Sequence, residues 1–226
     1  MRDAAADRQP FLPAFIDLRS KCCIVIGGGE VAARKVRPLL ASGASVRVIA
    51  LQLCAELEAL LQDPAVTCCR RAYVASDLEG SALVFAATDD AEVNAVVYRD
   101  ATALGILVNV VDDPDHCGFI VPSQIMRDGI CIAISTQGQS PALARHIRER
   151  IEQAVPPAYG ELARLLGRLR AEVKAAVPSA NERGRRWEAV LESDVLSLIQ
   201  QGRSADAEAL ARSILGLTTK PKASAG

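Results

Sequence analysis

Aromatic residues are scarce in this sequence: phenylalanine, tyrosine and tryptophan together make up 4% of its 226 residues. Because 50% of the residues are nonetheless hydrophobic, the core must be built mainly from aliphatic side chains. The same hydrophobic content excludes disorder for most of the chain. The length is enough for one large domain with a smaller appendage.

An excess of charge of either sign is also missing. Lysine and arginine number 26 against 27 aspartates and glutamates, so the net charge is −1. Without a global basic field, the protein is not expected to bind nucleic acid. The sequence has no uncharged apolar stretch of about 18 residues, and its first residues, MRDAAADRQP, contain no apolar segment. We therefore expect no membrane span and no signal peptide.

The seven cysteines contain no C-x-x-C pair, and their number is odd. Two adjacent pairs lie in apolar runs of strand type, Cys22/Cys23 and Cys68/Cys69. Neighbours on a strand point to opposite faces, so neither pair can easily chelate one ion. These features favour buried thiols in a reducing cytoplasm over a disulfide framework.

Apolar runs alternate with helical patterns over residues 20–111. Strands are expected at 21–26, 45–50, 66–71, 81–87 and 106–111, and helices at 30–40, 53–62 and 91–104. Pro38 should kink or shorten the first helix, and Gly43 should close it. The alternation requires parallel strands with crossover helices. Continuously apolar strands are typical of a sheet covered on both faces.

The pattern changes after residue 111. Residues 118–126 and 129–135 are strand-like, with a turn at Arg127-Asp128, which predicts a hairpin. Ser140 and Pro141 should begin a helix that runs to residue 154. Residues 159–214 are helical, basic and amphipathic, with a break near 178–181. The predicted fold class is α/β: a Rossmann-like parallel sheet domain, an α+β segment and a C-terminal helical domain.

A glycine motif, Gly27-x-Gly29-x-x-Ala32, stands between the first strand and the first helix. Gly27 permits a tight turn, Gly29 lets the backbone approach a pyrophosphate, and Ala32 lets the helix pack against the strand. The helix N-terminus adds unpaired N–H groups and partial positive charge. In this context the motif predicts dinucleotide binding; the alternative is a glycine-rich turn without a ligand.

The acidic residue that often ends the second strand of such sites is absent. Ile49, Ala50, Leu51 and Gln52 occupy that place, and no arginine cluster for a 2′-phosphate stands there. Backbone groups near Leu51 and Gln52 could hold the ribose instead. This position therefore leaves the choice of cofactor open.

Polar residues follow the fourth and fifth predicted strands, where ligands of open α/β sheets bind. Thr88-Asp89-Asp90 suits that edge; the alternative is a helix N-cap, and the two interpretations are compatible. In Asp112–His116, three carboxylates and a histidine could act as general base or acid, or meet a divalent cation. The alternative is a solvated turn. Ser123 is a further polar candidate.

Taken together, the motifs GGGEVAARK, AATDD, NVVDDP, GFIVPS and ISTQGQSPALAR follow one another in a familiar order and spacing. The chain resembles the precorrin-2 dehydrogenase/sirohydrochlorin ferrochelatase family, and most of all the N-terminal module of multifunctional siroheme synthase. The likeness covers residues 9–215. It implies NAD⁺-dependent oxidation of precorrin-2 to sirohydrochlorin, followed by insertion of Fe²⁺, a substrate, to give siroheme.

The resemblance also assigns roles to residues. Asp112 matches the family's catalytic acid/base. With the glycine motif, it places NAD contacts at Gly27, Gly29, Glu30, Val31, Leu51, Gln52, Thr88 and Asp89. Substrate carboxylates suggest Arg145, beside Arg148 and Arg150, with Ser123 and His116 as further candidates; ordinary helix surface charge is the alternative for the arginines. No resident metal is expected. The extra acidity of Asp113, Asp115 and His116 leaves metal handling open.

The family's dimer completes the expected organisation. We predict an NAD-binding domain at 1–113, a dimerisation segment at 114–150, a helical domain at 151–216 and a disordered tail at 217–226 in a cytoplasmic homodimer. Two other functions stay open: a dehydrogenase without chelatase activity, and a non-enzymatic NAD-sensing regulatory domain. The missing acid and the NVVD motif argue against the regulatory domain.

Overall fold

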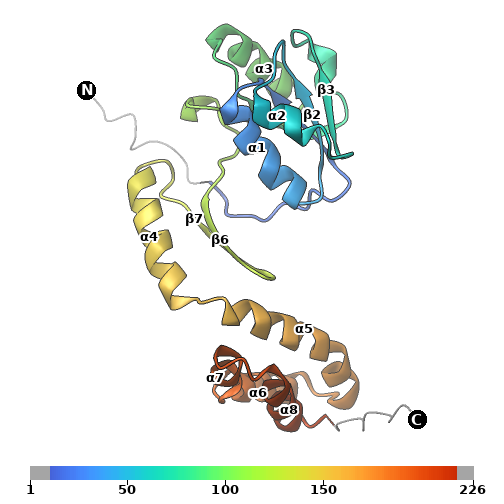
Figure 1. Ribbon diagram of the computed structural model, residues 1–226, viewed down its shortest axis with the longest axis vertical. Helices are drawn as coiled ribbons and strands as arrows, with labels where there is room; N and C mark the ends of the chain where they lie inside the picture. Colours follow the sequence, from blue (N-terminus) through green and yellow to red (C-terminus); the bar gives the residue numbers. More distant parts are fainter. Residues whose placement is uncertain (1–10, 218–226) are drawn as a thin grey trace. The chain divides into compact units, whose positions relative to one another are not determined.

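The computed structural model describes residues 11–217, which form two compact units that meet in sequence between Val121 and Pro122 (Figure 1). We call residues 11–121 the first unit and residues 122–217 the second unit. The tail expected at 217–226 lies outside the described residues except for Leu217. The division into four segments expected above remains a prediction. Within the described part, no helix combines the length and apolar character needed to cross a bilayer.

The first unit is built on a five-stranded parallel sheet of order β3-β2-β1-β4-β5. Its strands are β1 (Cys22–Ile26), β2 (Ser45–Ile49), β3 (Val66–Cys69), β4 (Ser81–Ala86) and β5 (Leu107–Val110). The register aligns Ile26 with Ile49 on one side and with Ala86 on the other, so the carboxyl ends meet at one edge. This is the Rossmann-like order, and the predicted fold class is confirmed.

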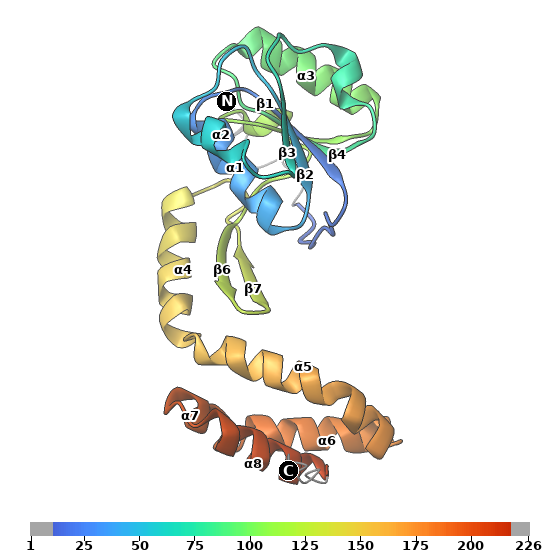
Figure 2. The ribbon, with the colours of Figure 1, turned by 45° about the vertical axis from the view of Figure 1, so that its right-hand side comes forward.

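Helices cover both faces of this sheet (Figure 2). The helices α1 (Glu30–Ala41) and α2 (Ala55–Leu60) pack on one face, and α3 (Ala91–Ala103) packs on the other with the short 3₁₀ helix η1 (Ala75–Leu78). Along β1, Val25 joins the core under α1, whereas Ile24 joins the core under α3. Both faces of the strand are therefore buried, which explains its unbroken apolar sequence.

The adjacent cysteines divide between the two faces, as expected. Cys23 and Cys68 contribute to the core under α1, while Cys22 and Cys69 pack against the core under α3. All seven cysteines are present as thiols. Burial raises the pKa of the Cys23 thiol to about 11, so this group stays protonated and inert at neutral pH.

Several predicted boundaries shift in the structure. The helix α1 continues past Pro38 to Ala41, and Gly43 follows it with φ +77°, as expected for a C-terminal glycine. The strand expected at 118–126 begins only at Ser123. The reason is that the preceding segment returns along β5, where the N–H of Gly118 donates to the oxygen of Val108 at 2.8 Å.

In the second unit, a hairpin packs on a helix. Its strands β6 (Ser123–Arg127) and β7 (Ile130–Ile134) are antiparallel, and α4 (Pro141–Ala154) contacts both. Between the strands, Asp128 and Gly129 both have positive φ, which matches a two-residue hairpin turn one residue later than predicted. The hydroxyl of Ser140 accepts from the N–H of Leu143, so the predicted N-cap is confirmed.

Four further helices form a separate core in this unit. They are α5 (Ala158–Ala176), α6 (Ala180–Leu191), α7 (Val195–Gln200) and α8 (Ser204–Leu215). The predicted break near 178–181 separates α5 from α6. The interior is aliphatic, with Leu165, Leu169, Val190 and Leu215 among the most buried side chains.

Candidate active site

The glycine loop after β1 is clamped between the ends of β2 and β4. Gly27 has φ +128°, and a Cβ there would lie 2.2 Å from the oxygen of Ala87. A Cβ on Gly28 would lie 1.8 Å from the oxygen of Gln52. The oxygen of Gly28 accepts from the N–H of Cys54 at 2.8 Å, which fixes the loop against the segment after β2. Gly28 therefore tolerates no side chain, although it is not a defining position of the motif.

The next residue, Gly29, is the N-cap of α1 and faces open space. Apart from the local backbone, no heavy atom of the described residues lies within 4 Å of the position that its Cβ would occupy. No side chain caps this helix end, so the first-turn N–H groups, including those of Glu30 and Val31, have no acceptor within the helix. Unpaired N–H groups and the positive end of the helix dipole fit the pyrophosphate of a dinucleotide.

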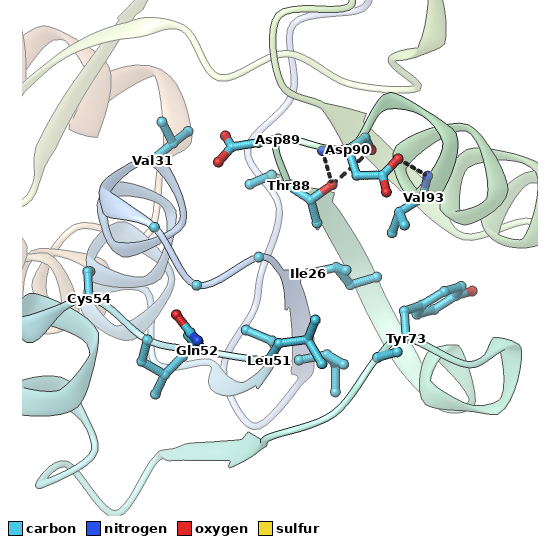
Figure 3. A pocket seen from close by; sticks show the side chains of 18 of the residues that line it. Ile26, Val31, Leu51, Gln52, Cys54, Tyr73, Thr88, Asp89, Asp90 and Val93 are labelled. Carbon is cyan, nitrogen blue, oxygen red and sulfur yellow. Dashed lines mark hydrogen bonds between the residues drawn. The ribbon is translucent and has the colours of Figure 1, made fainter.

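These residues open into a cavity of about 600 Å³ at the carboxyl edge of the sheet (Figure 3). A volume of this size suits a cofactor or small molecule. Figure 3 shows the glycine loop passing between Leu51 and Gln52 on one side and Thr88 and Asp89 on the other. The cavity is lined by every predicted nucleotide contact: Gly27, Gly29, Glu30, Val31, Leu51, Gln52, Thr88 and Asp89.

The loop after β4 is held by a small hydrogen-bond network. The hydroxyl of Thr88 donates to Asn94 Oδ1 at 2.7 Å, and Asn94 Nδ2 donates to the oxygen of Thr88 at 3.0 Å. Asp90 caps α3 by accepting from the N–H groups of Glu92 and Val93. Asp90 is therefore a helix cap, as one interpretation predicted, while Thr88 and Asp89 line the cavity and their contact with a ligand stays a prediction. The buried Asn94 was not predicted from the sequence, because only the turn between β4 and α3 brings Thr88 within its reach.

Two further cavity residues, Arg71 and Tyr73, come from the end of β3 and were also missed. The Arg71 guanidinium is engaged with the carboxylate of Asp77. The hydroxyl of Tyr73 donates to Asp100 at 3.1 Å, and burial together with this carboxylate raises the pKa of Tyr73 well above its usual value. The sequence indicated ribose contacts only after β2, whereas the parallel pairing places the end of β3 beside the end of β2.

Asp112, the predicted catalytic acid/base, lies just beyond β5 at the same edge. It is exposed and does not line the cavity, and its φ of +59° is in the left-handed region. The N–H of Val111 donates to the oxygen of Ala86 at 2.9 Å, which ties the start of the loop to the end of β4. Aspartate tolerates this backbone conformation better than most residues. The fold therefore presents the Asp112 carboxylate at the edge where the cavity opens.

Lys35, on α1, interacts electrostatically with Asp112. Burial lowers the pKa of Lys35, with a further decrease from Arg34, while the charge of Asp112 opposes that decrease. The Lys35 ammonium also lies 5.4 Å from the centre of the Phe85 ring. The motif GGGEVAARK includes this lysine, but only the fold brings its charge near Asp112.

The other acidic residues of the loop have different partners. Asp113 Oδ2 lies 2.6 Å from His116 Nδ1, and the His116 ring meets the Tyr98 ring edge-on with centroids 4.6 Å apart. His116 is thus paired with Asp113 rather than with Asp112. Within residues 11–217, no group of three or more histidine, cysteine, aspartate or glutamate side chains is arranged to hold a metal ion.

The remaining substrate candidates belong to the second unit. Ser123 begins β6 opposite Ile134 and is half-buried. Arg145 is exposed on α4, while the neighbouring Arg148 forms an ion pair with Glu152 at 2.7 Å. The substrate roles of Ser123, His116 and Arg145 remain predictions, as does the role of each cofactor contact.

Three family models match consecutive parts of the chain. Residues 14–123 match a model described as "Putative NAD(P)-binding". Residues 127–154 match "Sirohaem biosynthesis protein central", and residues 158–215 match "Sirohaem synthase dimerisation region". The dimerisation model thus falls on the last four helices, whereas the sequence prediction placed dimerisation at 114–150.

Curated relatives and a solved structure give the same result. The chain is 42% identical over 211 residues to siroheme synthase of Stutzerimonas stutzeri, covering 93% of this chain and 45% of that protein. It is 46% identical over 198 residues to siroheme synthase of Methylococcus capsulatus, covering 88% and 42%. The chain therefore spans less than half the length of these relatives.

The solved structure of SirC, precorrin-2 dehydrogenase, superposes with a TM-score of 0.73 at 22% identity, covering 90% of this chain and all of that one. This likeness supports the fold. The three family models and the curated relatives assign the chain to the family of siroheme biosynthesis proteins, which includes the corresponding part of siroheme synthase.

Proposed function

We propose that this chain oxidises precorrin-2 to sirohydrochlorin with NAD⁺ as the electron acceptor. The observation that carries the proposal is the cavity at the carboxyl edge of the sheet, lined by all eight predicted nucleotide contacts, with Asp112 just beyond the end of β5. This is the edge at which open α/β sheets bind nucleotides. The relatives named siroheme synthase supply the substrate class.

The residues of the cavity fit a dinucleotide. Gly29 leaves room for the pyrophosphate to approach the uncapped N-terminus of α1, where Glu30 and Val31 offer N–H groups. Backbone groups at Leu51 and Gln52 would hold the adenosine ribose, in place of the missing acid. Thr88 and Asp89 bound the cavity on the side of β4. When bound, NAD⁺ supplies the hydride acceptor.

Asp112 would provide the base. In the oxidation, the substrate loses a hydride to NAD⁺ and a proton to the Asp112 carboxylate, giving NADH, the oxidised product and a protonated carboxyl group. The left-handed backbone at Asp112 exposes its side chain at the edge of the sheet. The Asp112 carboxylate also lies within electrostatic reach of the Lys35 ammonium on α1.

Insertion of Fe²⁺ into sirohydrochlorin is the second proposed activity. The relatives named siroheme synthase favour it, because siroheme contains iron. The same Asp112 carboxylate would accept the pyrrole protons as the metal enters. Two alternatives stay open: a dehydrogenase without chelatase activity, and an NAD-sensing regulatory domain without catalysis.

We also propose that the chain acts as a homodimer. The match of residues 158–215 to a dimerisation region supports this assembly. The sequence prediction of contacts from 114–150 is compatible with it, because the two segments could both contribute. Size-exclusion chromatography with light scattering should give twice the 24.0 kDa mass of one chain; a monomer at micromolar concentration would contradict the assembly.

The decisive experiment mixes the protein with precorrin-2 and NAD⁺ under anaerobic conditions. Formation of NADH together with the sirohydrochlorin spectrum is expected. If NAD⁺ binds but the spectrum does not change, the regulatory alternative gains support and the dehydrogenase proposal fails. A second reaction, with sirohydrochlorin and Fe²⁺ but no NAD⁺, separates the bifunctional enzyme from a dehydrogenase alone.

A further inference from the structure

The side of the cavity nearest β3 carries a cation. Arg71 lines the cavity from the end of β3, together with Leu51 and Gln52 from the end of β2. The two strands are parallel neighbours, paired as far as Ile49 and Cys69. In dinucleotide-binding sheets, the segment after the second strand meets the ribose that carries a 2′-hydroxyl in NAD⁺ and a 2′-phosphate in NADP⁺. Arg71 therefore borders the region where the two cofactors differ.

The guanidinium of Arg71 is held by one buried carboxylate. Its two terminal nitrogens donate to the two oxygens of Asp77 at 2.6 and 2.8 Å, and one of them also donates to the oxygen of Ala72 at 3.0 Å. The Asp77 side chain is only 5% exposed, against 47% for Arg71. The N–H of Val74 donates to Asp77 at 3.0 Å as well, so the carboxylate has a fixed position.

This pairing neutralises the cation. The Arg71 guanidinium holds the pKa of the Asp77 carboxyl below its usual range, although burial opposes this effect, so Asp77 is ionised at neutral pH. A bidentate pair uses the planar fork that would otherwise grip a phosphate. Near the ribose, the cavity is then bordered by the neutral Arg71–Asp77 ion pair and by the uncharged residues Leu51 and Gln52. None of these groups attracts or repels a 2′-phosphate by net charge.

We infer that Asp77, by pairing with Arg71, sets the preference of this cavity for NAD⁺ over NADP⁺. Asp77 is a positioning residue: it acts through Arg71 and does not touch the nucleotide. Removing the Asp77 charge leaves an arginine without its carboxylate at the rim, where it can bind a 2′-phosphate. The inference rests on the proposed NAD⁺-binding function and goes beyond it, because the matching family model does not distinguish the two cofactors.

A neighbouring pair provides a matched control. One terminal nitrogen of Arg70 donates to both oxygens of Glu58 at 2.7 and 2.8 Å, whereas Arg71 uses both of its terminal nitrogens with Asp77. Arg70 does not line the cavity. Glu58→Gln therefore releases Arg70, the residue before Arg71 in the sequence, outside the nucleotide cavity.

The experiment measures the Kd of NAD⁺ and of NADP⁺ by calorimetry for the full chain and its variants. The unmodified protein should bind NAD⁺ more tightly. Asp77→Asn, which keeps an acceptor for Val74, should lower the Kd of NADP⁺ by about tenfold or more and leave that of NAD⁺ nearly unchanged. Arg71→Ala combined with Asp77→Asn should abolish the gain, and Glu58→Gln should change neither constant.

If a folded Asp77→Asn protein still binds NAD⁺ but the ratio of its two Kd values is unchanged, the inference is wrong. The proposed function is then unaffected. Equal binding of both cofactors by the unmodified protein also overturns the inference. Failure of the unmodified protein to bind NAD⁺ contradicts the proposed function as well.

A second variant covers the case in which Asp77→Asn does not fold. Arg71→Lys leaves Asp77 and its bond to Val74 in place, but an ammonium cannot form the bidentate pair. The loosened cation should improve NADP⁺ binding by a smaller factor than Asp77→Asn. A Kd ratio identical to that of the unmodified protein would contradict the inference.

Discussion

The two units of the chain place their polar side chains differently. The buried polar residues of the described chain are Asp77, Asn94 and Asn109, and all three belong to the first unit. In the second unit, charged groups pair at the helix surface instead, as Arg148 does with Glu152 and Arg212 with Glu172. The buried polar groups of the first unit hold the backbone in place, whereas the ion pairs of the second unit lie on the surfaces of helices.

Each buried polar residue of the first unit holds a loop that leaves the carboxyl edge of the sheet. Asp77 accepts from Val74 after β3, Asn94 holds Thr88 after β4, and Asn109 Nδ2 donates to the oxygen of Phe119 beyond the Asp112 loop. A buried polar group without partners would be costly, so these loops are held firmly. Among the described residues, buried polar groups therefore serve to hold the loops around the candidate active site.

The largest effect should come from the charge at that edge. Asp112→Asn removes the proposed base without changing its size, and turnover of precorrin-2 should fall by about 10²–10⁴-fold while the Kd of NAD⁺ stays the same. Absorbance of NADH under anaerobic conditions measures the rate, and calorimetry measures the binding.

The matched control is Asp113→Asn in the same loop, since Asp113 is paired with His116. It should retain most of the activity. If instead Asp112→Asn stays active, the acid/base role moves to Asp113, Asp115 or His116.

A pair of glycine substitutions compares the two units directly. Gly28→Ala forces a Cβ to within 1.8 Å of the oxygen of Gln52, which is fixed backbone. We expect a loss of about 1–3 kcal/mol in the free energy of unfolding and weaker NAD⁺ binding, because the loop must move. Chemical denaturation and calorimetry measure the two effects.

Gly167→Ala is the counterpart in the second unit. Gly167 lies within α5, and outside the backbone of that helix no heavy atom of the described residues lies within 4 Å of its missing Cβ. The substitution should raise stability by up to about 1 kcal/mol, because alanine favours a helix more than glycine does. Equal effects of the two substitutions would mean that the glycine loop is not clamped as described.

Acid should destabilise the first unit through Asp77. Its pKa in the folded protein is lowered by Arg71, so it lies below the unfolded value of about 3.9. The stabilisation from ionised Asp77 is therefore fully present above that unfolded value and is lost as the pH falls through the folded pKa. Asp77→Asn should flatten the acid limb of the stability profile, measured by denaturation between neutral pH and pH about 2; an unchanged slope would refute the coupling.

The smallest effect is expected from the surface pairs of the second unit. Glu152 accepts from Arg148 at 2.7 Å and from Arg127 at 3.3 Å, and all three side chains are partly exposed. Glu152→Gln should cost only about 0.5 kcal/mol, and less at high salt. A loss above about 2 kcal/mol would show that this pair behaves like the buried groups of the first unit.

Much of the fold was predictable from the sequence because it rests on local patterns. Apolar runs and helical periods predicted all five parallel strands, the helices of the first unit, the hairpin and the helical C-terminal region. Errors occurred where a distant segment competes, as at Gly118, whose hydrogen bond to Val108 prevents it from starting the hairpin. The Ser140 N-cap was predictable for the opposite reason: its partner, Leu143, is three residues away.

The candidate site was predictable in part. Glycines and polar residues that follow strands β1, β2 and β4 must gather at one edge, because parallel strands share their direction. Arg71 and Asn94 escaped prediction: the importance of Arg71 depends on β3 lying beside β2, and that of Asn94 on the turn that brings Thr88 back to it.

The sequence by itself determined which segments become strands and helices, and which residues could meet at the carboxyl edge, because periodicity and strand direction are properties of the chain. Only the tertiary structure decided that the oxygen of Gln52 excludes a side chain at Gly28. It also decided that Lys35 lies near the charge of Asp112, and that Asp77 neutralises Arg71 beside the cavity. These relations depend on distances of a few ångströms between segments far apart in the sequence, which packing alone sets.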